Sequence, residues 1–205
     1  MPGVPFERSA CDIICHCRSE EEARARLDRR LRNCGLALHP QKTKLVYCKD
    51  TNRKEEFDFV RFDFLGYRFQ PRLAQRAPAK SCYGLFGVSF LPAARPEALV
   101  AIRRRVRRWG LQRRSDKSLF DLARMFEPYS RGWIGYFSHF YKSALYQTLR
   151  LIDVHLVRWV QRKYKRFKER PRGARAWLAS IIRAYPDLFV HWRLIHGNGR
   201  TLGAV

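Results

Sequence analysis

Two clusters of basic side chains are the part of this 205-residue sequence best suited to bind a ligand. Guanidinium and ammonium groups carry full charge and donate several hydrogen bonds, so both bind phosphate oxygens. Only Glu97 and Asp116 offset the first cluster, and only Glu169 offsets the second. Unpaired like charges on one helix destabilise it, so we interpret both clusters as phosphate-binding rather than as solvated helix faces. The residues concerned are Arg103, Arg104, Arg107, Arg108, Arg113 and Arg114 in the first cluster, and Arg162, Lys163, Lys165, Arg166 and Lys168 in the second.

Aromatic side chains accompany these cations. Tyr164 and Phe167 lie inside the second cluster, where they could stack on unpaired bases or pack on the protein core. The sequence leaves both alternatives open. Trp133, Phe137 and Phe140 recur at helical spacing, which predicts that they belong to the core.

The sequence predicts no metal site. Cys15, His16 and Cys17 are adjacent, but on a strand the two thiols point to one face and the imidazole to the other, so they cannot share one tetrahedral zinc ion. No second pair of ligands follows at zinc-binding spacing. Three later histidines are His155, His191 and His196. None stands at a spacing from a nucleophile that would make it a catalytic base, so we predict that they are structural.

The charge of the chain indicates a polyanionic partner. Lys and Arg number 42 against 18 Asp and Glu, a net charge of +24. Residues 71–205 hold 28 of the basic but only 7 of the acidic side chains, so the binding surface is expected there. No segment is apolar enough to span a membrane and no signal peptide is recognisable, so we expect a cytoplasmic protein with reduced cysteines. Binding to a membrane surface is a weaker alternative, because the interleaved aromatic residues suit nucleic acid.

Short strands and one helix are predicted up to about residue 91. Residues 6–17 read as two strands around a tight turn at Ser9–Asp12. Ser19 and Glu22 form a capping box for a helix that ends at Gly35. Two strands are predicted on either side of a turn at His39-Pro40, and alternating apolar side chains predict the later ones, with a polar loop before the last. These strands are Leu36–Leu38, Thr43–Cys48, Val60–Leu65, Tyr67–Phe69 and Tyr83–Leu91, and the loop is Pro71–Lys80.

The period of the apolar residues changes from 2 to about 3.6 after Pro92, which predicts helices. They begin at Pro96 and at Ser118, and further helices span Arg131–Tyr141, Ser143 to about Lys168, and about Gly173–Tyr185. The predicted fold class is therefore α+β. Short antiparallel strands with one helix occupy residues 1–91, an all-α domain occupies 92–195, and 196–205 form a C-terminal tail.

Several segments resemble group II intron reverse transcriptases, in the order found in that family. Residues 6–14, which read FERSACDII, are similar to the family's Phe-x-Arg-Tyr-Ala-Asp-Asp segment and the apolar strand after it. Leu38–Lys44 is similar to the next family element, and Phe62–Tyr67 to the hairpin that grips the primer end. Leu122–Arg124 with Arg131–Phe137 resembles the maturase-specific thumb segment called domain X, and Phe189–Trp192 resembles the closing element.

The resemblance implies the end of a reverse-transcriptase palm followed by a thumb or maturase domain. Polymerases hold two Mg²⁺ ions on carboxylates. The family's aspartate pair reads Cys11-Asp12 here, so Asp12 is the remaining catalytic carboxylate, and a thiol is a poor Mg²⁺ ligand. The fingers and the earlier palm strands are absent from this sequence. We therefore expect no cofactor and no polymerisation by this chain alone, although the intact family uses Mg²⁺. The resemblance also directs Arg131 toward the intron RNA.

These observations predict an RNA-binding fragment of a reverse transcriptase–maturase, which binds group II intron RNA and assists its splicing. The intact family also binds target DNA. One alternative is the C-terminal half of an active RNA-directed DNA polymerase, assembled with a separate N-terminal part. Another is a relic of a mobile element without a selected role, and a general DNA-binding protein is a weaker alternative. The oligomeric state is not indicated.

Overall fold

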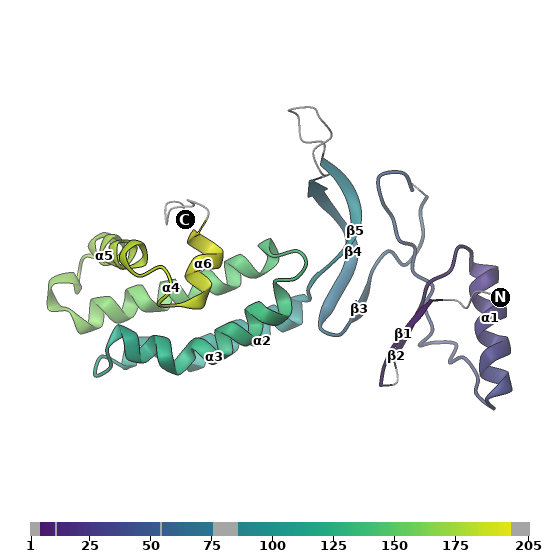
Figure 1. Ribbon diagram of the computed structural model, residues 1–205, viewed down its shortest axis with the longest axis horizontal. Coiled ribbons are helices and arrows are strands. Elements are labelled where there is room, and N and C mark those ends of the chain that lie inside the picture. The colour runs from purple at the N-terminus through teal and green to yellow at the C-terminus, as the bar shows by residue number, and fades with distance from the viewer. Residues whose placement is uncertain (1–4, 11, 54, 76–85, 198–205) are drawn as a thin grey trace. The chain divides into compact units, whose positions relative to one another are not determined.

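The computed structural model describes residues 5–10, 12–53, 55–75 and 86–197. The chain divides into two compact units, unit 1 (Met1–Leu91) and unit 2 (Pro92–Val205) (Figure 1). Two small antiparallel sheets and one helix precede five helices in the described residues, which confirms the predicted α+β class. None of the described helices is long and apolar enough to cross a lipid bilayer.

The first sheet of unit 1 is a hairpin of β1 (Phe6–Ser9) and β2 (Asp12–Cys15). Ser9 lies opposite Asp12, so a two-residue turn joins the strands where the sequence predicts it. Ala10 in this turn has a φ of 52°, in the left-handed region that tight hairpin turns use. Among the described residues no third strand pairs with this hairpin, and a lone two-stranded sheet is only marginally stable.

Helix α1 (Glu20–Asn33) follows and begins as predicted. The Ser19 hydroxyl accepts the Glu22 N–H at 3.2 Å, and the Glu22 carboxylate accepts the Arg18 N–H at 3.2 Å. The carboxylate therefore bonds one residue earlier than a standard capping box requires. At the other end, Gly35 adopts a φ of 69°, which closes the helix with the left-handed residue expected there.

The segment 36–53 is irregular, so the predicted strands Leu36–Leu38 and Thr43–Cys48 are wrong. Its backbone is held instead by a side chain. The Thr51 hydroxyl accepts the Val88 N–H at 2.8 Å, and the Thr51 N–H donates to the Val88 carbonyl at 3.0 Å. These bonds join residues 37 positions apart, and they tie the segment to β5 without forming a strand ladder.

The second sheet has three strands, which lie side by side in the order of the sequence. They are β3 (Phe62–Phe64), β4 (Tyr67–Gln75) and β5 (Phe86–Ala94). Leu65 and Gly66 join β3 to β4 with φ values of 49° and 76°, as in a two-residue hairpin turn. The predicted loop Pro71–Lys80 is wrong for residues 71–75, which belong to β4, and its remainder lies outside the described residues. Because β3 pairs only with residues 67–69, Pro71 removes no hydrogen bond to β3.

Unit 2 is helical and centred on one long helix, α4 (Figure 1). Helices α2, α5 and α6 and two 3-10 turns, η1 and η2, all pack against α4. The elements are α2 (Pro96–Arg108), η1 (Leu111–Arg113), α3 (Leu119–Phe137), α4 (Ser143–Lys163), η2 (Lys165–Phe167), α5 (Pro171–Ala184) and α6 (Val190–His196). The sequence did not predict α6, because seven residues are too few for a clear helical period.

Two helix boundaries differ from the prediction. Helix α3 is continuous through Pro128, where two separate helices were predicted, and it ends at Phe137 instead of Tyr141. Packing of its buried face outweighs the low helix propensity of proline and glycine within it. Helix α4 ends at Lys163 rather than Lys168, because Tyr164 is extended and its ring contacts the core.

The two units differ in how much apolar surface they bury. The described part of unit 1 has Phe64 and Tyr67 as its buried hydrophobic side chains. Unit 2 has one continuous core with contributions from all its helices, and it contains all five tryptophans of the chain. The largest completely buried side chains in it are Trp159, Trp192, Leu111, Leu122, Leu145, Leu149, Ile152, Leu156 and Leu178.

Candidate nucleic-acid interface

Helix α2 presents its arginines to solvent because its apolar residues are committed to the core. Ile102 and Val106, one turn apart, are buried, whereas Arg104, Arg107 and Arg108 are exposed.

Arg103 is the exception on this helix. Its guanidinium group lies 3.5 Å from the hydroxyl of the buried Thr148 on α4, so this side chain links two helices.

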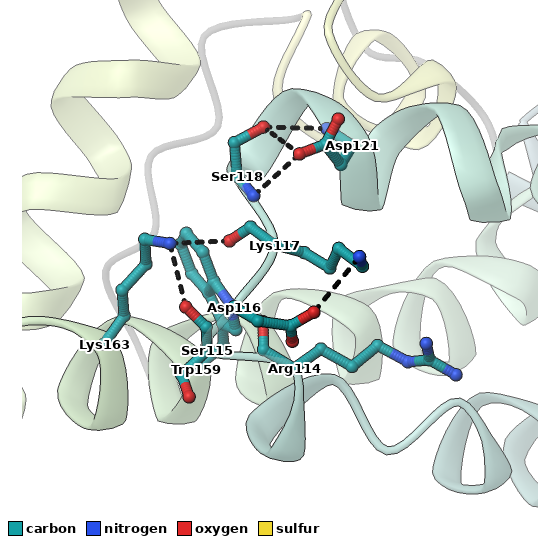
Figure 2. A network of polar contacts seen from close by, with 8 residues as sticks. All are labelled: Arg114, Ser115, Asp116, Lys117, Ser118, Asp121, Trp159 and Lys163. Carbon is teal, nitrogen blue, oxygen red and sulfur yellow. Dashed lines mark hydrogen bonds and ion pairs between the residues drawn. The ribbon is translucent and has the colours of Figure 1, made fainter.

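Helix α4 fixes the connection between α2 and α3 (Figure 2). The Trp159 indole N–H donates to the carbonyl of Arg114 at 2.9 Å. The Lys163 ammonium donates to the carbonyls of Ser115 and Lys117 at 2.9 and 2.7 Å. These bonds satisfy three backbone acceptors that no regular element uses, so Trp159 and Lys163 act first as supports of this loop.

The start of α3 completes this network (Figure 2). The Ser118 hydroxyl accepts the Asp121 N–H at 3.1 Å, and the Asp121 carboxylate accepts the Ser118 N–H at 2.9 Å, which is a full capping box. Hydrogen bonds from the Ser118 hydroxyl and backbone lower the pKa of Asp121. At the other end of the connection, Gly110 has a φ of 59°, which ends α2 in a left-handed turn.

A buried carboxylate, Asp153, joins α4 to α6. Its oxygens accept hydrogen bonds from the imidazole of His191 at 3.1 Å, the indole of Trp192 at 2.8 Å and the imidazole of His196 at 3.1 Å. Burial by itself raises the pKa of Asp153, but the charge and hydrogen bond of His191, with the other two donors, outweigh it and hold this pKa below its usual range. Asp153 was not among the residues predicted from the sequence.

The structural role predicted for the histidines agrees with this geometry for His191 and His196. His155 differs from them, because it is buried and neither of its ring nitrogens has a hydrogen-bond partner in the described structure.

The predicted phosphate-binding residues divide into two groups. In the described part of the chain, seven have side chains with no hydrogen bond, ion pair or ring contact: Arg104, Arg107, Arg108, Arg113, Arg162, Lys165 and Lys168. The other five have protein partners, so part of their binding capacity is already used. Arg103 contacts Thr148, Arg114 donates to the Trp109 carbonyl, Arg131 pairs with Glu127, Lys163 holds the loop, and Arg166 lies over the Phe167 ring. Phosphate binding remains a prediction for both groups.

Three of the free cations line a surface pocket of about 550 Å³ between η1, α4 and η2. Its lining contains no acidic residue and consists of Gln112, Arg158, Gln161, Arg162, Lys165 and Lys168. Arg158 and both glutamines lie outside the dense basic runs of the sequence. Helical spacing places Gln161 on the same face as Arg158, Arg162 and Lys165, but no local pattern connects Gln112 on η1 to them.

The cations of α2 and α4 belong to the same region of unit 2. Burial, followed by the charges of Arg158 and Arg107, lowers the pKa of His155 on α4. Both arginines therefore lie close enough to His155 to disfavour its protonation. Of these two arginines, Arg158 also lines the pocket.

The aromatic residues of the second cluster pack on the core, which resolves one alternative left open by the sequence. Tyr164 and Phe167 are partly buried, and both rings contact Trp177. Trp133 and Phe137 also pack on the core as predicted. The prediction is wrong for Phe140, which lies beyond the end of α3 and is 55% exposed.

The candidate catalytic residue in unit 1 is solvent-exposed. Asp12 is the first residue of β2, and Cys11 lies outside the described residues. Within the described ranges, no three His, Cys, Asp or Glu side chains are grouped so that they could hold a metal ion. Burial is the main cause that raises the pKa of the Cys15 and Cys17 thiols.

A comparison with protein families matches residues 99–177 to the maturase-specific domain of group II introns. No curated protein and no solved structure matches the chain. The matched residues run from Leu99 in α2 to Trp177 in α5, and they include the pinned α2–α3 connection, Asp153 and the whole basic pocket. Residues 99–177 therefore match a group II intron maturase-specific domain, and this match supports the C-terminal region of a group II intron maturase.

Proposed function

We propose that this protein binds folded group II intron RNA through the basic surface of α2, η1, α4 and η2 and thereby assists splicing. The observation that carries this function is the set of free cations on these elements. Arginine and lysine side chains that meet no acid among the described residues are available for phosphate oxygens, whose binding releases counterions. The match to the maturase-specific domain supports intron RNA as the partner.

The surface assists splicing by differential binding. A folded RNA brings phosphates from separate strands close together, and a rigid cationic surface binds that arrangement more tightly than an extended chain. The protein then shifts the RNA population toward the compact form by the difference in affinity between the two states. Rigidity comes from α4, which anchors the loop carbonyls through Trp159 and Lys163 and anchors α6 through Asp153.

The test compares a panel of folded group II intron transcripts with shuffled transcripts of equal length at about 150 mM salt, near physiological ionic strength. We expect tighter binding to at least one folded intron and faster splicing of it at limiting Mg²⁺. If about eight phosphates are neutralised, the slope of log K against log salt is about −6 on single-stranded segments. Equal affinity for folded and shuffled RNA would contradict intron recognition, and equal competition by duplex DNA would indicate general nucleic-acid binding.

We also propose that the chain by itself does not add nucleotides. A thiol stands at Cys11 beside Asp12, and a thiol is a poor ligand for the Mg²⁺ ions that nucleotide addition requires. Primer extension on an RNA template with Mg²⁺ and all four deoxynucleotides tests this expectation directly. Extension by the purified chain would show that it is an RNA-directed DNA polymerase.

A further inference from the structure

The pocket between η1, α4 and η2 has an unusual lining for a protein surface. Each of its six side chains is polar, and none makes a hydrogen bond or an ion pair with the described residues. Elsewhere in unit 2, comparable side chains have partners: Arg131 pairs with Glu127 and Arg193 pairs with Asp187. Four cations that face one pocket without an acid repel one another, and an anionic ligand removes that repulsion.

The pocket is larger than a phosphate group requires. A volume of about 550 Å³ lies within the range of about 300–1,000 Å³ typical of pockets for small organic ligands. The cations come from two consecutive elements, with Arg158 and Arg162 on α4 and Lys165 and Lys168 at η2 and its end. A ligand with a phosphate at its edge and a further polar group inside fits this distribution.

Two glutamines supply that second kind of contact. Gln112 on η1 and Gln161 on α4 line the pocket from separate elements. The Gln112 side-chain oxygen is buried without a hydrogen-bond partner in the described structure, and exchanging the amide oxygen and nitrogen would leave a buried donor unpaired instead. A buried polar atom without a partner is destabilising, and a ligand with both donors and acceptors can supply the missing hydrogen bond.

We propose that this pocket holds one unpaired nucleotide of the bound RNA, with its phosphates on the four cations and the edge of its base on Gln112 and Gln161. The pocket ligand rests on the proposed function, because the bound RNA supplies the nucleotide. Proteins read RNA sequence mainly at unpaired bases. A glutamine amide matches the adjacent donor and acceptor of adenine, so adenine is the expected base.

The test uses the full chain and three RNA probes of about 12 nucleotides at about 100 mM salt, where phosphate contacts are only partly screened: oligo(A), oligo(U) and the same backbone with abasic ribose. The wild-type chain is expected to bind oligo(A) about tenfold more tightly than the abasic backbone, in line with roughly 1–3 kcal/mol for a bidentate amide–base contact. The double variant Gln112→Leu/Gln161→Leu is expected to lose this tenfold difference and to bind the abasic backbone as the wild type does. The matched control is Gln147→Leu, an exposed glutamine of α4 outside the pocket, which should leave all three affinities unchanged.

The remaining outcomes separate the pocket from the surface around it. Arg162→Gln/Lys165→Gln should weaken all three probes by a similar factor, because these residues contact phosphate. If the glutamine variant binds all three probes as the wild type does, the pocket holds phosphate alone and the base contact is wrong, while intron binding by the surface still stands. If the wild-type chain shows no preference for oligo(A) over the abasic backbone, the nucleotide assignment is likewise overturned. If no RNA binds at all, including folded introns, the proposed function fails as well.

Discussion

Helices α1 and α2 each carry five arginines, but they use them in opposite ways. On α1, acidic residues stand four positions before three of the arginines, and the pairs Glu20–Arg24, Glu22–Arg26 and Asp28–Arg32 form. On α2, Glu97 is the sole acid. The arginines of α2 face solvent, Thr148 or an aromatic ring. The number of arginines is therefore a poor guide to function, and the presence of an acid one turn away is a better one.

The same contrast extends to the two units. Unit 1 neutralises much of its surface charge internally and buries few apolar side chains in its described part. Unit 2 places its free cations on a packed helical core. A surface on which like charges repel needs such a core, because the repulsion opposes folding.

The largest expected effect breaks the core that supports the cations. Asp153→Ala leaves His191, Trp192 and His196 without their buried acceptor, which should cost unit 2 about 3–5 kcal/mol of unfolding free energy. Because all the tryptophans lie in unit 2, denaturant titration followed by tryptophan fluorescence measures this change. A loss below about 1 kcal/mol, the typical value of a single hydrogen bond, would show that the network contributes little.

Acid should weaken the same network gradually. The folded-state pKa of Asp153 lies below its ordinary value, so its stabilisation is complete above the pKa of an unfolded aspartate, about 3.9. It is lost as pH falls from there toward the folded pKa. We therefore expect the melting temperature of unit 2 to fall below about pH 4 in the wild type, with a smaller fall in Asp153→Ala. Parallel pH profiles for the two proteins would contradict this assignment.

Neutralising three free cations in one variant and three paired arginines in another tests the comparison between helices directly. The triple variant Arg107→Gln/Arg162→Gln/Lys165→Gln should lower the affinity for folded intron RNA roughly fiftyfold at about 150 mM salt. Arg24→Gln/Arg26→Gln/Arg32→Gln removes the same charge from α1 and should change the affinity less than about threefold, because those arginines pair with acids. Equal losses would show that net charge alone determines binding.

Lys163 separates support from binding within the basic surface. Lys163→Met removes two bonds to loop carbonyls and should lower the stability of unit 2 by about 2 kcal/mol. RNA affinity should fall less than about threefold, since two of the three ammonium N–H donors are already bonded to loop carbonyls and only one is left for phosphate. A large loss of affinity with unchanged stability would identify Lys163 as a phosphate ligand instead.

The smallest effect is expected on α1. Glu20→Gln or Asp28→Asn removes one exposed ion pair each, and such pairs on a helix contribute about 0.3–0.5 kcal/mol. Thermal unfolding followed by circular dichroism, compared at about 20 mM and about 500 mM salt, should show a small difference at low salt that disappears at high salt.

Local rules predicted the elements whose ends carry strong signals. Ser19 and Gly35 bound α1 as expected, and Pro96 begins α2. The prediction failed at 43–48, where the apolar run Leu45–Cys48 resembles a strand but the backbone meets no partner strand in the described residues. Strand pairing depends on residues distant in the sequence, so a local apolar run cannot establish it.

The site was predictable as a region but not as a set of contacts. Charge density located both clusters, yet it could not separate adjacent residues by role: Arg162 lines the pocket, whereas Lys163 holds a loop 48 positions earlier. Asp153 gave a usable signal, because an acid beside Ile152 on an apolar helix must have a partner. Its partners lie 38 to 43 positions away, and the sequence offers no rule that connects them.

One helix, α4, carries both the buried carboxylate and two arginines of the pocket. A ligand held by those arginines is held only while α4 is folded, so occupancy and folding are thermodynamically linked. At a ligand concentration about one hundred times its dissociation constant, the native state gains about 2.7 kcal/mol. Heating the protein with and without an added polyanion would therefore reveal occupancy of this surface even before the natural RNA sequence is known.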